Sequence, residues 1–197
     1  MRSRTLATAR LPKRPDLADV FRAYPLGVAE LLAYHDALLR GDSPLSVGER
    51  ELIAVFVSSL NACGFCFGAH RIIAERFGVQ PDVVEHLLTD IDRAPIPARL
   101  KPIFKLLAKL TRAPASVEAA DREAVFAAGW NERALHDAIA VCALFNFMNR
   151  LVEGMGVVTT PAIRAAQRAR HARGALADSK TPYQDYSRLI GVLPRHG

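Results

Sequence analysis

The sequence predicts an all-α protein, a single domain of seven or eight helices around two central buried helical hairpins. The apolar runs are long, and none of them alternates apolar and polar residues as a half-buried strand would. Several runs also end at a glycine, at Gly41, Gly78 and Gly129, which is typical of helices closed by a left-handed residue. The length of 197 residues suits one domain with a sizeable core.

Residues 1–15 carry five Lys or Arg and no acid. This composition is found in organellar transit peptides, but we interpret it as a flexible basic arm on a cytoplasmic protein. A helix is then predicted from Leu17 to Arg40. His35 lies within it beside Asp36, and we interpret this histidine as a solvated or packed residue rather than as one near the functional site.

The stretch from Ser46 to Gly78 organises the rest of the chain. Ser46 and Glu49 have the spacing of a capping box, which marks a helix start. The run 52–57 is apolar on all sides, so this helix should be buried. A second helix is predicted to begin near Cys63 and to end at Gly78.

The following helices are predicted from caps and from apolar periodicity. Ser116 is expected to cap one helix, and residues 129–131 to end it and cap the next. The longest helix should run from Glu132 to Glu153, and its apolar middle should be buried within the subunit or between subunits. The full set after Gly78 is 81–90, 99–112, 116–128, 132–153 and 161–177.

Three features of the second half of the chain are interpreted as structural. Cys142 lies in the apolar middle of the longest helix and should be an inert core thiol. Asn146, Asn149 and Arg150 should form interhelical ties, because buried polar groups need hydrogen-bond partners. The apolar tail (Tyr183, Tyr186, Leu189 and Ile190) should dock on the body or on a neighbouring subunit.

The positive charge belongs to the ends of the chain. Residues 1–15 and 161–197 each carry a net charge of +5, whereas residues 16–160 carry −4. A nucleic-acid-binding surface would need its basic residues on a folded face, so this class of function is disfavoured. We therefore divide the chain into a basic arm (1–15), a helical domain (16–160) and a basic C-terminal helix with a docking tail (161–197). No apolar run reaches eighteen residues, so no membrane span is predicted.

The chemistry concentrates at Cys63-x-x-Cys66, with His70 four residues later and Glu51 on the preceding helix. The spacing places the two cysteines and His70 on one helical face. A thiolate beside an imidazole at a helix N-terminus is the pattern of an activated nucleophile, so we expect a Cys66 pKa below about 8.5. Zinc needs four ligands and the only other cysteine is Cys142, so redox chemistry is favoured over a zinc half-site or a structural cysteine pair.

These four residues match the signature E-x11-C-x2-C-x3-H, and the chain from about Leu26 to Val158 resembles the alkylhydroperoxidase D-like (AhpD-like) family. The similarity is greatest to the peroxidase-related branch of this family, within the carboxymuconolactone decarboxylase superfamily. By this resemblance Cys66 is the peroxidatic sulfur, Cys63 its resolving partner, and His70 with Glu51 a proton relay. The chain has Phe65 where the best-studied members have a second histidine.

The resemblance implies a homo-oligomer, trimeric or hexameric, that needs neither a metal nor an organic cofactor. Its substrate would be an organic hydroperoxide, and an external dithiol such as a lipoyl or thioredoxin-like protein would reduce it again. The alternatives are a dithiol–disulfide oxidoreductase without peroxide activity and a carboxymuconolactone decarboxylase-like protein. The decarboxylases do not require a redox-active cysteine pair, so Cys63 and Cys66 count against the latter.

Overall fold

The computed structural model describes residues 11–172 and 179–194, and the elements found there are helices. This confirms the predicted fold class. The order is α1 (Leu17–Ala23), α2 (Val28–Arg40), α3 (Val47–Leu60), α4 (Gly64–Arg76), α5 (Val83–Thr89), α6 (Lys101–Arg112), α7 (Ala119–Ala127), α8 (Glu132–Gly154), α9 (Pro161–Ala172) and α10 (Pro182–Leu189). Two short 3₁₀ turns, Ala98–Leu100 and Pro114–Ser116, precede α6 and α7.

These ten α-helices in the described residues exceed the seven or eight predicted. The helix expected from Leu17 to Arg40 is two helices, because Gly27 between them adopts a left-handed conformation with φ of 75°. The apolar tail forms a helix of its own, α10. A further correction concerns α7, whose cap is Glu118 and not Ser116.

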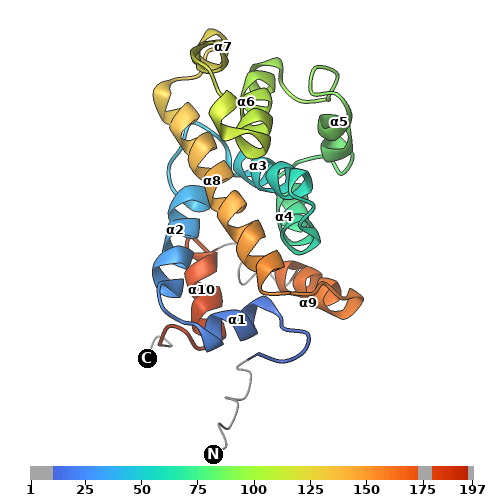
Figure 1. Cartoon of the computed structure of the whole chain (residues 1–197), viewed down its shortest axis with the longest axis vertical. Coiled ribbons are helices and arrows are strands. Elements are labelled where there is room, and N and C mark those ends of the chain that lie inside the picture. The colour runs from blue at the N-terminus through green and yellow to red at the C-terminus, as the bar shows by residue number, and fades with distance from the viewer. Residues whose placement is uncertain (1–10, 173–178, 195–197) are drawn as a thin grey trace, which may run out of the picture.

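The α3–α4 hairpin forms the centre of the molecule, and α8 runs along it for most of the molecule's length (Figure 1). Helix α3 begins at Ser46 with the expected reciprocal capping box. Residues 52–57 are buried on every side, as predicted. Helix α8 begins at Asn131, whose side chain accepts a hydrogen bond from the amide of Ala134.

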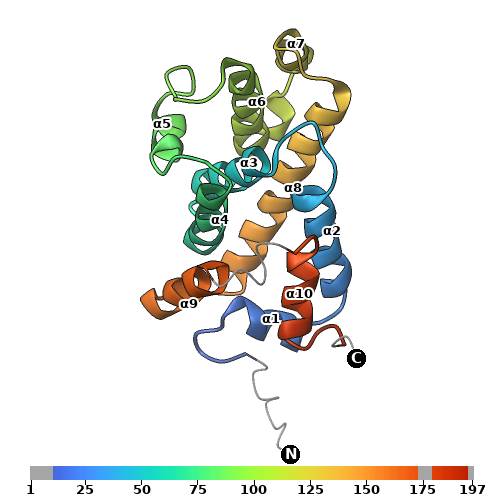
Figure 2. The same cartoon turned by 180° about the vertical axis from the view of Figure 1, so that it is seen from behind.

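The C-terminal segment packs on the body rather than extending away from it. Helix α10 lies beside α2 in both views (Figures 1 and 2), and α9 contacts α4. The segment that leads into α1 is also held against the chain after α8, because the amide of Val158 donates a hydrogen bond to the carbonyl of Pro15. The division into arm, domain and tail stays a prediction, and residues 1–10 and 173–178 lie outside the described part.

Because α3 packs closely against the end of α4, alanine substitutions of glycines in the two helices should differ in their effect on stability. A Cβ at Gly48 would lie 2.7 Å from the carbonyl oxygen of Phe77, whereas one at Gly68 on α4 would meet nothing within 4 Å. Gly48→Ala should therefore lower the free energy of unfolding by about 1–3 kcal/mol. Gly68→Ala should leave it unchanged or raise it by up to about 1 kcal/mol. Urea unfolding of both variants checks this, and equal stability of the two would contradict the packing.

Candidate active site

The turn between α3 and α4 sets the position of the cysteines. Ala62 takes a left-handed conformation with φ of 54°, and the Cys63 amide then donates to the carbonyl of Ser58 at 2.9 Å. The Asn61 side chain donates to Asn146 at 3.1 Å and to Asn149 at 2.9 Å, both on α8. These bonds fix Cys63 as the N-cap of α4 and place Cys66 in its first turn.

The two cysteines are free thiols, and they differ in what they face. Cys66 lines a cavity, whereas Cys63 is 1% exposed and lies outside the cavity lining. Hydrogen bonding from the Cys66 side chain lowers the pKa of Cys63, against the effect of burial. The same hydrogen bond, together with burial, raises the pKa of Cys66. The pair therefore lowers the pKa of Cys63 and not that of Cys66, contrary to the expected low pKa of Cys66.

Glu51 lies at the centre of the site and has no solvent exposure. Nη1 of Arg40 on α2 donates to Oε1 of Glu51 at 2.6 Å, and Nδ1 of His70 on α4 is 2.7 Å from Oε2. The Tyr183 hydroxyl of α10 makes a longer contact of 3.5 Å to Oε1. Burial alone would raise the pKa of Glu51, but His70 and Arg40 outweigh it and lower that pKa. The carboxylate is thus a buried anion held by residues of three other helices, α2, α4 and α10.

The imidazole of His70 is fixed at one nitrogen and open at the other. Because Nδ1 meets the Glu51 carboxylate, it carries the proton, and Nε2 is left for the cavity. The ring packs edge-on against Phe145 with centroids 4.5 Å apart. Among the described residues no hydrogen bond joins His70 to Cys66, and the hydrogen bond with Cys63 is the largest influence on the pKa of Cys66. Activation of the thiol by His70, as expected from the spacing, stays a prediction.

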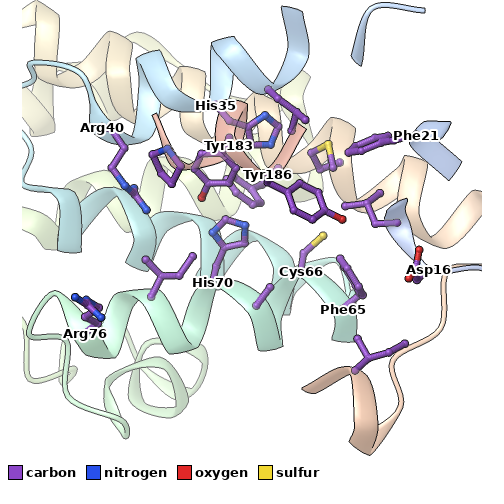
Figure 3. A pocket seen from close by; sticks show the side chains of 18 of the residues that line it. Asp16, Phe21, His35, Arg40, Phe65, Cys66, His70, Arg76, Tyr183 and Tyr186 are labelled. Carbon is purple, nitrogen blue, oxygen red and sulfur yellow. The ribbon is translucent and has the colours of Figure 1, made fainter. Parts of the chain in front are cut away.

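The cavity between these groups has a volume of about 220 Å³ and is mainly apolar. Cys66 and His70 project into it from α4, and Tyr183 and Tyr186 of α10 close it from another side (Figure 3). The lining is Asp16, Leu17, Phe21, Leu32, His35, Arg40, Phe65, Cys66, Ala69, His70, Ile73, Arg76, Phe77, Phe145, Met148, Ile163, Pro182, Tyr183 and Tyr186.

Comparisons with known proteins identify the family of the chain. The model of the carboxymuconolactone decarboxylase family matches residues 25–94. A solved structure described as a peroxidase-related protein from Silicibacter sp. TM1040 is 32% identical; the match covers 75% of this chain and 78% of that one, with a TM-score of 0.68. The chain belongs to the AhpD-like family.

A second AhpD-like structure supports the same assignment. It is described as an alkylhydroperoxidase AhpD core, a peroxidase-related protein from Ralstonia eutropha JMP134. It is 30% identical with a TM-score of 0.67, and the match covers 76% of this chain and 78% of that one. No curated protein matches the sequence.

Several residues of this AhpD-like site were not predicted from sequence. Arg40 and Tyr183 reach Glu51 from α2 and α10, and His35 lines the cavity. The buried carboxylate of Asp36 accepts hydrogen bonds at 2.9 Å from the amides of Tyr183 and Gln184, which begin α10. Asp36 thereby caps a helix whose own N-cap residue makes no side-chain bond. The neighbouring pair His35-Asp36 was the only sequence signal, and it carried no indication of α10.

Of the residues predicted as interhelical ties, Asn146 and Asn149 are confirmed by their bonds to other helices, whereas the prediction for Arg150 is wrong. Asn149 is buried and donates to Ser58 at 3.1 Å, in addition to its bond from Asn61. Arg150 is exposed and bonds within its own helix, to Asn146. Cys142 is buried on α8, and burial raises its pKa.

No group of three or more His, Cys, Asp or Glu side chains in 11–172 and 179–194 could hold a metal ion. None of the helices in that part of the chain is long and apolar enough to cross a membrane.

The burial of His35 predicts how the stability of the protein depends on pH. Burial lowers the pKa of His35 from 6.5 to about 4, so the folded protein keeps it neutral where the unfolded chain binds a proton. This contribution to stability is present above pH 6.5 and is lost as the pH falls toward 4, by about 3 kcal/mol in total. Urea unfolding at several pH values should show a weaker acid dependence for His35→Gln than for the parent.

The control for this measurement is His86→Gln, since His86 is an exposed histidine. This variant should keep the parent's pH dependence. An acid dependence unchanged in His35→Gln would contradict the assignment. Burial also raises the pKa of the adjacent Asp36, against the hydrogen bonds that it accepts from Tyr183 and Gln184. The raised pKa of Asp36 increases stability as the pH falls, opposite to the effect of His35, and it does so in the parent and in His35→Gln.

Proposed function

We propose that the protein is a thiol-dependent peroxidase that reduces organic hydroperoxides through Cys63 and Cys66, with Glu51 and His70 as its proton relay. The observation that carries this proposal is the cavity. One apolar space of about 220 Å³ is lined by both the Cys66 side chain and the His70 imidazole. An apolar wall suits the organic part of a hydroperoxide, while the sulfur and the imidazole suit its two oxygens. The peroxidase-related descriptions of the two solved relatives support the same class of reaction.

In the first step the reduced pair provides the nucleophile. The Cys63 sulfur takes the proton of Cys66, since the two side chains already share a hydrogen bond. The Cys66 thiolate then attacks the terminal oxygen of the hydroperoxide, so that an S–O bond forms as the O–O bond breaks. The electron pair of that bond leaves on the alkoxide, which receives a proton through His70 and departs as the alcohol.

In the second step the pair closes a disulfide. Cys66 is now a sulfenic acid, and the thiol of Cys63 attacks its sulfur and releases water. The short spacing at the start of α4 keeps the two sulfurs close. An external dithiol then reduces the disulfide by exchange and is itself oxidised to a disulfide. Over the cycle the hydroperoxide is reduced to alcohol and water as the dithiol is oxidised to a disulfide.

Glu51 serves this cycle by holding His70. A carboxylate on Nδ1 fixes the tautomer that leaves Nε2 for the substrate, and it stabilises the imidazolium that forms on proton uptake. Arg40 holds the carboxylate ionised from the other side. The relay therefore acts on the departing oxygen rather than on the thiol.

A second candidate, a dithiol–disulfide oxidoreductase, rests on the lowered pKa of Cys63. In many C-x-x-C proteins a low-pKa cysteine attacks the disulfide of a partner. Here Cys63 is 1% exposed, which disfavours attack on a protein disulfide. Rapid oxidation by a hydroperoxide separates the two functions.

The cycle predicts a specific product. One equivalent of cumene hydroperoxide should link Cys63 to Cys66, which mass spectrometry of digests would detect. Cys66→Ser should abolish peroxide consumption, whereas Cys142→Ser should retain it, because Cys142 is a buried thiol of the α8 core. A stable sulfinic acid at Cys66 with a free Cys63 would exclude the disulfide cycle.

The relay predicts that turnover and thiol reactivity separate. Glu51→Gln and His70→Ala should each slow peroxide turnover by roughly 10²-fold or more, since proton delivery is impaired. Alkylation of Cys66 by iodoacetamide should keep its pH profile in both variants, because no hydrogen bond joins His70 or Glu51 to Cys66 among the described residues. A profile moved by His70→Ala would instead make the imidazole the activating partner of the thiol.

We also propose that the chain forms a homo-oligomer, a trimer or hexamer. An apolar surface supports it, which we call the Leu26 patch and define as Tyr24, Leu26, Tyr34, Phe147, Leu151 and Met155. Leu26 is 99% exposed and Phe147, on α8, is 51% exposed. Exposed apolar residues gathered at one place are typical of a subunit contact.

Light scattering at micromolar concentration should therefore give a multiple of 21.5 kDa. Leu26→Glu combined with Phe147→Glu should lower the measured mass, because like charges would be buried without partners. Phe126→Glu on α7 is the matched control, since Phe126 is also exposed but lies outside the patch. A monomeric parent would contradict the proposal.

A further inference from the structure

A second imidazole lines the same cavity. His35 on α2 is 3% exposed, and its Nδ1 lies 2.7 Å from the carbonyl oxygen of Leu31. A carbonyl only accepts hydrogen bonds, so Nδ1 carries the proton and Nε2 has a free lone pair. Among the described residues no side chain or backbone group donates a hydrogen bond to Nε2. The buried side-chain atoms that lack a hydrogen-bond partner do not include Nε2, so this atom is not enclosed in the core. The open edge of the ring therefore belongs to the cavity that it lines.

His35 and His70 flank the ring of Tyr183. The centroid of His35 is 5.1 Å from that of Tyr183, and His70 stacks on Tyr183 at 6.3 Å. Figure 3 shows the three side chains coming from α2, α10 and α4, with the Cys66 sulfur in the same space. A small molecule beside Cys66 is thus within a cavity that offers two imidazole nitrogens.

The two imidazoles have different chemical characters. Nδ1 of His70 meets an anionic group, the Glu51 carboxylate. Nδ1 of His35 meets a neutral carbonyl, and burial disfavours the charged form of this ring. His35 is therefore a fixed hydrogen-bond acceptor, while His70 can exchange protons. The other polar rings of the cavity, Tyr183 and Tyr186, have no sp² nitrogen and so offer no acceptor of this kind.

We propose that His35 is a substrate-orienting residue: its Nε2 accepts the hydrogen bond of the hydroperoxide O–H and presents the terminal oxygen to Cys66. This assignment rests on the peroxidase function proposed above and adds a recognition group for the –OOH end. It also distinguishes substrates, because an alcohol product keeps one O–H but loses the second oxygen, and a dialkyl peroxide has no O–H to donate. The bond forms in the substrate complex, and no proton is transferred to His35 in the step.

The test compares two reactions of the same sulfur in single turnover. Oxidation of Cys66 by cumene hydroperoxide uses an O–H, whereas alkylation by iodoacetamide does not. His35→Phe should slow the oxidation by roughly tenfold, the effect of one lost hydrogen bond, and leave alkylation within about twofold. His35→Gln, whose amide oxygen can accept, should recover part of the rate. His86→Gln, on the surface, should behave as the parent.

The outcomes separate the two proposals. If the parent is not oxidised by the hydroperoxide, the peroxidase function fails and the role of His35 fails with it. If the parent reacts and His35→Phe is equally fast, or slows alkylation to the same extent, only the role of His35 is overturned.

A binding measurement keeps the proposal testable if His35→Phe does not fold. In a Cys63→Ser, Cys66→Ser protein labelled with ¹⁵N-histidine, cumene hydroperoxide should shift the Nε2 resonance of His35. Cumene, which lacks the –OOH group, should not. Equal responses to the two compounds, or none to either, would overturn the assignment.

Discussion

The site depends on one buried interaction, the contact of the Glu51 carboxylate with Arg40 and His70. An ionised carboxylate without partners would cost several kcal/mol to bury, and in general it would become protonated instead. Here a guanidinium at 2.6 Å and an imidazole at 2.7 Å compensate for that burial. Because the partners come from α2 and α4 and the acid from α3, the same contact ties three helices together. A change in the charge of Glu51 should therefore alter both the stability of the fold and the chemistry of the site.

The two cysteines at the start of α4 differ in their surroundings. The sulfur that is reachable from the cavity, Cys66, is not the sulfur whose pKa the pair lowers. In the proposed cycle, attack by Cys66 therefore follows a proton shift between the two neighbouring sulfurs. The relay of His70 and Glu51 is thereby free to serve the oxygen side of the reaction.

Features that are encoded locally were predictable from sequence. The capping box of Ser46 and Glu49, the buried run of α3 and the Asn131 start of α8 depend on residues within a few positions of each other. The break before α2 was missed, because the apolar spacing continues across a residue, Gly27, whose conformation the spacing does not encode. The cap of α7 was misplaced by two residues for a similar reason, since Glu118 and Asp121 form the box in place of Ser116.

The long-range parts of the site could not be predicted in this way. The motif spacing indicated Glu51, Cys63, Cys66 and His70, but it carries no information on Tyr183, which is 132 positions from Glu51. The contact exists because Asp36 caps α10 and holds it on α2. That bond depends on the packed fold, and no local pattern marks it.

The central claim is that Glu51 is an ionised carboxylate inside the protein. Carbon-13 NMR of the Glu51 carboxyl group, assigned by its loss in Glu51→Gln, tests this most directly as the pH is lowered. Arg40 and His70 predict that the group stays ionised below the ordinary glutamate pKa of about 4.3. A carboxyl group that titrates at or above that value would contradict the account, since burial would then outweigh its partners.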